Sequence, residues 1–187
     1  MGPDEPSRPA YGPLLILASS VALVAVMLTW TYLGMRAVMD VGGSCASGGP
    51  YEIAQPCPGG AWMISVAIPV LLIAAMLGSL LAARLSAPTL LLPMWAILFG
   101  ALGWNFLAYG FGPDGPVAGW IVCGVLFELM ALPAVAVMVA GARWAAVPAA
   151  LVTGASRGPR PAAWYAAYAA LGAAGLVLGW WTFEAWS

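Results

Sequence analysis

Five long stretches of the chain are almost free of charged residues. They run from Pro13 to Met35, Ala61 to Ala83, Leu85 to Pro113, Gly115 to Ala142 and Pro161 to Phe183, and Glu128 is the one charge within them. A helix needs about 20 apolar residues to cross the hydrocarbon core of a bilayer. The stretches lack the alternating polarity of barrel strands. Lipid offers no hydrogen-bond partners to backbone groups, so each stretch is expected to form a helix, which satisfies these groups internally. The pattern predicts an all-α integral membrane protein, a bundle of five transmembrane helices.

The predicted spans cover residues of about 13–35, 61–83, 88–111, 116–141 and 162–183, and together form a single domain over 13–187. An outer loop at 36–60 and an inner loop at 143–160 are rich in glycine and proline, which favour turns. Residues 1–12 are expected to be a cytoplasmic tail and not a cleaved signal peptide, because they carry no net positive charge. Pro69, Pro93 and Pro133 are predicted to kink the second, third and fourth spans.

Composition narrows the class of protein further. Hydrophobic residues make up 63% of the 187 residues and charged residues 7%, whereas a soluble domain has about 25% charged residues. A protein with so few charged residues is expected to expose most of its surface to lipid. Its net charge of -1 gives no basic surface for binding nucleic acid. The chain has no histidine and no lysine, which excludes histidine-ligated metals, Ser-His-Asp catalysis and Schiff bases. We therefore expect no catalytic residue, metal or cofactor.

Arginine positions predict the orientation of the five spans. With a cytoplasmic N-terminus, the inner side carries Arg8, Arg84, Arg143, Arg157 and Arg160, and the outer side carries Arg36. This asymmetry follows the positive-inside rule. The expected location is the plasma membrane, with the C-terminus on the extracytoplasmic side.

Cys45 and Cys57 lie in the outer loop, on the face that is expected to be oxidising. A disulfide between them would close a loop of about a dozen residues and stabilise it by about 3 kcal/mol. The alternative is a redox pair, as in membrane thiol oxidoreductases that pass electrons to a quinone. The chain has no Cys-x-x-Cys, and Cys123 is a single thiol in the fourth span, so the structural disulfide is favoured.

Glu128 and Asn105 are the polar residues of most interest within the spans. Glu128 lies near the middle of the fourth span, where an ionised carboxylate is costly. It can relay protons, bind a cation or form a hydrogen bond between helices, and the sequence does not decide among these roles. Its candidate partners are Ser19, Ser20, Thr29, Ser65, Ser79, Asn105 and the backbone carbonyl of Leu129, which Pro133 deprives of its helical donor.

Asn105 lies nearer the outer end of the third span, about 8 Å in depth from Glu128 at 1.5 Å per residue. An interhelical hydrogen bond by Asn105 is favoured over a water-filled vestibule that reaches Glu128. In the fifth span, Gly172, Gly175 and Gly179 form a small-residue face that suits close helix packing. Packing within the bundle is favoured over packing against another chain.

Several segments resemble one group of proteins. They are GGSCASGGPYEI at 42–53, PCP at 56–58, GWNF at 103–106 and CGVLFE at 123–128. These segments resemble uncharacterised multipass membrane proteins of high-GC actinobacteria. The resemblance implies a multipass membrane protein of the cell membrane and implies no activity.

The function expected from the sequence is that of a non-enzymatic integral membrane protein. It would be a membrane-complex subunit or a small oligomeric permease with an intramembrane carboxylate. The alternatives are a thiol-disulfide oxidoreductase that uses the outer cysteine pair with a quinone, and an extracytoplasmic ligand-binding or sensing module. The expected partners are the lipid bilayer and a second copy or other membrane subunits, with no nucleic acid.

Overall fold

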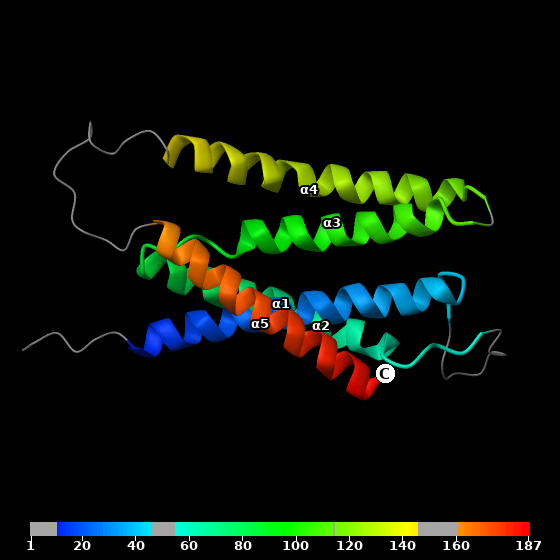
Figure 1. The fold of residues 1–187 in the computed structure, drawn as a ribbon, viewed down its shortest axis with the longest axis horizontal. Helices are drawn as coiled ribbons and strands as arrows, with labels where there is room; N and C mark the ends of the chain where they lie inside the picture. Colours follow the sequence, from blue (N-terminus) through cyan, green and yellow to red (C-terminus); the bar gives the residue numbers. More distant parts are fainter. Residues whose placement is uncertain (1–10, 46–54, 114, 146–160) are drawn as a thin grey trace, which may run out of the picture.

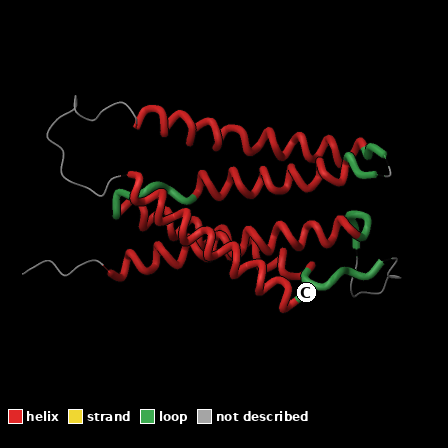
Figure 2. The backbone as a smooth tube through the Cα atoms, in the orientation of Figure 1, coloured by secondary structure: helices red, strands yellow, loops and turns green. Residues whose placement is uncertain are grey.

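The computed structural model describes residues 11–45, 55–113, 115–145 and 161–187, and these residues form five α-helices and no strand (Figures 1 and 2). The helices are α1 (Tyr11–Asp40), α2 (Ala61–Arg84), α3 (Leu91–Gly110), α4 (Ala118–Ala145) and α5 (Pro161–Trp186). All five are long and apolar enough to cross a membrane. The predicted all-α architecture with five long apolar helices is therefore confirmed for the described residues. Most of the predicted tail and most of the predicted inner loop lie outside those residues, and the last two residues of the predicted tail, Tyr11 and Gly12, belong to α1.

The helices alternate in direction along the bundle (Figure 1). One end, which we call the disulfide end, holds the end of α1, the start of α2, the end of α3, the start of α4 and the end of α5. The opposite end holds the start of α1, the connection from α2 to α3 and the start of α5. The disulfide between Cys45 and Cys57 lies at the first of these ends and connects the chain after α1 to the chain before α2.

Several boundaries differ from the predicted spans, and two of these differences change how a residue is interpreted. α1 continues to Asp40, so Arg36 lies in a helix and not in the loop where the sequence analysis placed it. α3 begins at Leu91, three residues later than expected, so Pro93 lies in its first turn. A proline is tolerated in the first turn because an N–H there has no partner within the helix. Pro93 is therefore a helix-start residue, which corrects the predicted kink in the third span.

The bundle consists of two unequal units. α1 is central and packs against α2, α5 and α3, whereas α4 makes its extensive contacts with α3 alone. The three-helix unit is α1, α2 and α5; the α3/α4 hairpin lies beside it and is attached through α3 (Figure 1). Most of the surface of α4 is consequently exposed.

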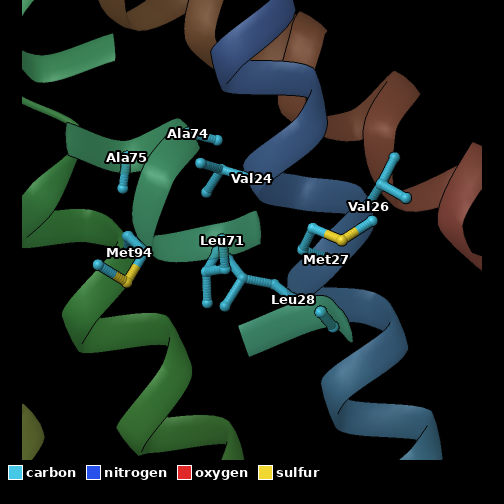
Figure 3. Close-up of a cluster of buried hydrophobic side chains, with 9 residues drawn as sticks. Val24, Val26, Met27, Leu28, Leu71, Ala74, Ala75 and Met94 are labelled. Carbon is cyan, nitrogen blue, oxygen red and sulfur yellow. The ribbon is translucent and has the colours of Figure 1, made fainter. Parts of the chain in front are cut away.

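The core lies where α1, α2 and α3 meet. Its buried residues are Val24, Val26, Met27 and Leu28 of α1, Ala67, Leu71, Ala74 and Ala75 of α2, and Met94 of α3. Figure 3 shows Leu71 at the centre of this cluster, between Met94 on one side and Met27 and Leu28 on the other. Met94 is the buried residue that the hairpin contributes to this core, and the partly buried Leu98 of α3 packs against it.

Glycines decide how closely α5 approaches α1. A Cβ on Gly175 would lie 2.5 Å from the carbonyl oxygen of Ala22, and one on Gly179 would lie 2.8 Å from Cβ of Thr29. A Cβ on Gly172 would meet nothing within 4 Å. The structure thus places Gly175 and Gly179 in the α1–α5 interface and leaves Gly172 outside it.

Candidate functional site

The α3/α4 interface holds the carboxyl group of Glu128. A Cβ on Gly103 would lie 2.8 Å from Oε1 of Glu128, and a Cβ on Gly124 would lie 3.0 Å from the carbonyl oxygen of Gly103. The two glycines therefore bring the backbones together, because small residues permit close approach of helices. The half-buried Glu128 lies against the backbone of α3, near the middle of the apolar segment Ala118–Ala140.

The serine and threonine side chains predicted as partners of Glu128 either bond to other groups or lie on helices that make no extensive contact with α4. The hydroxyls of Ser20 and Thr29 donate to carbonyls of their own helix, at 2.8 Å and 2.9 Å. Ser79 accepts a hydrogen bond from Thr89, at 3.1 Å. Ser19 and Ser65 belong to α1 and α2, which make no extensive contact with α4. Within the described residues, the carboxyl of Glu128 has no hydrogen-bond partner.

Pro133 lies inside α4 and has no N–H, so the carbonyl of Leu129 loses its usual helical donor. A side chain of α3 bonds to the neighbouring carbonyl of α4. The indole nitrogen of Trp95 donates to the carbonyl oxygen of Met130, at 3.0 Å. This carbonyl is next to that of Leu129, a predicted partner of Glu128. The ring of Trp95 also packs on Phe99, with centroids 4.5 Å apart, and Phe99 packs on Phe127 at 5.9 Å. The hairpin is therefore held by one interhelical hydrogen bond and a row of aromatic rings.

Asn105 connects α3 to α1. Its side chain is fully buried, and Nδ2 donates to the carbonyl oxygen of Tyr32, at 3.3 Å. Its Oδ1 is buried without a partner in the described residues. Asn105 thus makes an interhelical hydrogen bond, as the sequence analysis favoured, and its partner is a backbone group of α1.

One turn beyond Asn105, a polar cluster joins α1 to α3 at the disulfide end. The guanidinium carbon of Arg36 lies 5.9 Å from the ring centroid of Tyr32 and 5.3 Å from that of Tyr109. The hydroxyl of Tyr109 donates to the carboxylate of Asp40, and its ring meets the edge of Trp120 at 5.9 Å. We call Tyr32, Arg36, Asp40 and Tyr109 the Arg36 cluster.

The Arg36 cluster is not predicted from the sequence, because Arg36 is expected in a loop and lies in α1. The spacing of Tyr32, Arg36 and Asp40 was a usable signal, since residues four apart share one face of a helix. Tyr109 completes the cluster from a different helix, and no spacing within α1 reveals that contact.

Cys45 and Cys57 form the predicted disulfide, with their Cα atoms 4.9 Å apart. The nearby Gly60 has a φ of 80° and lies against α5, where a Cβ would come within 2.8 Å of Phe183. A positive φ is costly for other residues, which accounts for glycine here. Cys123 is an exposed free thiol on α4. The described residues contain no group of three or more His, Cys, Asp or Glu placed to hold a metal ion.

Two grooves open on the surface of the three-helix unit. One of about 360 Å³ lies between α1 and α2, and one of about 270 Å³ lies between α1 and α5. Both are lined almost wholly by apolar side chains, and Glu128 lines neither of them. Their chemistry suits hydrocarbon better than a hydrophilic solute.

No family model, curated protein or solved structure shows significant similarity to the chain.

Proposed function

We propose that the protein is a non-enzymatic, five-span protein of the plasma membrane that acts as a subunit of a membrane complex. The five long apolar helices and their many exposed apolar side chains support insertion into a bilayer. The concentration of arginines on one side of the spans supports a cytoplasmic N-terminus and an extracytoplasmic disulfide end.

Glu128 is the observation that carries the proposed role in assembly. A polar group in hydrocarbon without a hydrogen bond costs about 1–3 kcal/mol by protein mutational data. The half-buried carboxyl of Glu128 lies at mid-span without an internal partner among the described residues. A helix from a second copy or another subunit that donates or accepts a hydrogen bond there would remove this cost. α4 offers access for such a helix because it packs extensively on α3 alone.

Assembly is favoured over transport by the chemistry of the surface grooves. A permease needs polar groups along a path for its substrate, whereas the grooves beside α1 are apolar and lie away from Glu128. A carboxyl that serves as a hydrogen-bonding group between helices needs no such path.

The test compares association of the full chain in native-like bilayers by energy transfer between labelled copies, and with other subunits by co-purification. Glu128→Leu removes the hydrogen-bonding group, and we expect association to weaken about threefold, since interhelical hydrogen bonds average about 0.6 kcal/mol. Glu128→Gln keeps hydrogen-bonding capacity and should stay near wild type. Glu184→Gln is the matched control, because Glu184 is an exposed acid that accepts from Trp180 of its own helix.

Equal association of wild type and Glu128→Leu in both assays would contradict the assembly role. A second measurement addresses transport directly, by following proton and cation flux in liposomes that contain the purified protein. We expect no flux above that of empty liposomes. Flux that disappears in Glu128→Gln would overturn the proposal in favour of an oligomeric permease.

A further inference from the structure

Arg36 occupies an unusual position among the arginines of the protein. Of the arginines in the described residues, it alone lies at the disulfide end, since Arg84 ends α2 and Arg143 lies in the last turn of α4. Its guanidinium is placed beside the rings of Tyr32 and Tyr109. Such cation–π contacts hold an arginine in place without using its N–H donors.

The expected internal partner of Arg36 is engaged by another group. Asp40 lies four residues further along α1, the spacing at which opposite charges pair on a helix. Its carboxylate instead accepts a hydrogen bond from Tyr109. The hydrogen bond found for the Arg36 guanidinium is a long one, 3.5 Å from Nη1 to the hydroxyl of Tyr32. Among the described residues, most of the five N–H donors of this guanidinium therefore have no hydrogen-bond partner.

The surrounding contacts hold this arrangement in place. Asn105 donates to the carbonyl oxygen of Tyr32, which ties the base of the cluster to α3. Trp120 at the start of α4 packs against Tyr109, and a Cβ on Gly43 would lie 3.1 Å from the Trp120 ring. Arg36 is half-exposed, and contacts among residues of α1, α3 and α4 hold its guanidinium in place.

We propose that Arg36, held beside Tyr32 and Tyr109, binds a phosphate-type oxyanion at the disulfide end. A guanidinium matches two oxygens of a phosphate with two parallel hydrogen bonds, and this pairing is both strong and directional. The phosphate belongs either to the headgroup of an anionic phospholipid or to a free phosphate ion. The lipid source rests on the membrane insertion proposed above, whereas the free-ion source does not.

The test measures binding of phosphatidylglycerol, phosphatidylcholine and inorganic phosphate to the full chain in detergent, by native mass spectrometry and by Trp fluorescence. Phosphatidylglycerol should bind the wild type, and Arg36→Gln should weaken that binding about five- to tenfold. Arg84→Gln is the matched control, because Arg84 is an exposed arginine at the opposite end of the spans. Equal loss in both variants, or no loss in Arg36→Gln, would overturn the proposal. Circular dichroism and an intact disulfide verify that each variant is folded.

Two further variants leave Arg36 in place and remain informative if Arg36→Gln misfolds. Asp40→Asn removes the nearest competing carboxylate and should tighten binding of the oxyanion. Tyr109→Phe frees the carboxylate of Asp40 to pair with Arg36, so this variant should bind the oxyanion more weakly. Unchanged binding in both would contradict the proposal.

Inorganic phosphate distinguishes the two sources. Competition between phosphate and phosphatidylglycerol supports one shared site, and binding of phosphate alone, when lost in Arg36→Gln, assigns the site to the free ion. Binding of neither probe to the wild type overturns the proposal and leaves the assembly role of Glu128 untouched.

Discussion

The centre of the three-helix unit and the α3/α4 hairpin differ in how much of each helix is buried. In an apolar 18-residue window, 56% of the residues are buried in α1 and 33% in α2, compared with 22% in α3 and 17% in α4; α5, at the edge of the three-helix unit, is also 17% buried. α1 has neighbours on three sides, and α4 has one extensive neighbour. α1 and α2 therefore carry most of the internal packing, and the exposed apolar surfaces of α4 and α5 are left for lipid or a partner helix to cover.

The difference extends to the interactions that hold each region. Buried aliphatic side chains and close-packed glycines join α1 to α2 and α5. Gly103 and Gly124 also bring α3 and α4 close together, but the side chains that join these two helices include stacked aromatic rings and an indole that donates to a carbonyl. Substitutions should therefore cost more free energy in the three-helix unit than in the hairpin.

The largest effect is expected from Leu71→Ala. Leu71 is fully buried at the centre of the core, so its truncation leaves a cavity and should lower the free energy of unfolding by about 2–5 kcal/mol. Leu126→Ala on α4 is the matched control, because Leu126 is 55% exposed and should cost less than about 0.5 kcal/mol. Denaturation in mixed micelles measures both. Equal losses of unfolding free energy in Leu71→Ala and Leu126→Ala would contradict the stronger packing of the three-helix unit.

The next effect concerns the disulfide. Cys45→Ser combined with Cys57→Ser opens a loop that spans 12 positions of the sequence and should cost about 3 kcal/mol by loop entropy. Cys123→Ser, which removes the exposed thiol of α4, should change little. Unfolding with and without reductant gives the comparison.

The redox state of the same pair in cells tests the alternative function. Thiol labelling followed by mass measurement should find Cys45 and Cys57 oxidised in nearly every molecule, as for a structural bond. A pair that cycles between thiol and disulfide would favour the oxidoreductase.

Gly175→Ala should have an intermediate effect. The added Cβ would meet the backbone of α1 at Ala22, so α5 must shift, at a cost of about 1–3 kcal/mol. Gly172→Ala adds the same methyl group where nothing lies within 4 Å and should be neutral or slightly stabilising. Unfolding measurements that rank the two variants the other way would mean that α5 does not pack on α1 through this face.

The smallest effect is expected within the hairpin, from Trp95→Phe. This change removes the hydrogen bond to the carbonyl of Met130 and should cost about 0.6 kcal/mol. Trp104→Phe is the control, since Trp104 is 61% exposed on the same helix. A cost above that of Gly175→Ala would show that the hairpin is held more tightly than the three-helix unit.

The sequence alone determined the class of fold, the number of long helices and the cysteine pair. Apolar length sets where a helix can cross lipid, and this property is local, so the stretches around Ala61–Arg84 and Pro161–Trp186 were recognisable without a structure. The pairing of Cys45 with Cys57 was equally accessible, because they are the two cysteines outside the long apolar stretches.

Tertiary structure decided which face of each helix meets a neighbour. Gly172 and Gly175 look alike in the sequence, yet the crossing of α5 over α1 buries only the second in the interface. The same holds for Glu128, which rests on Gly103 instead of a hydroxyl, and for Arg36, which meets Tyr109 of another helix. In a uniformly apolar helix the sequence carries little information about rotation, because every face is compatible with lipid. Contacts between residues far apart in the chain must select one face.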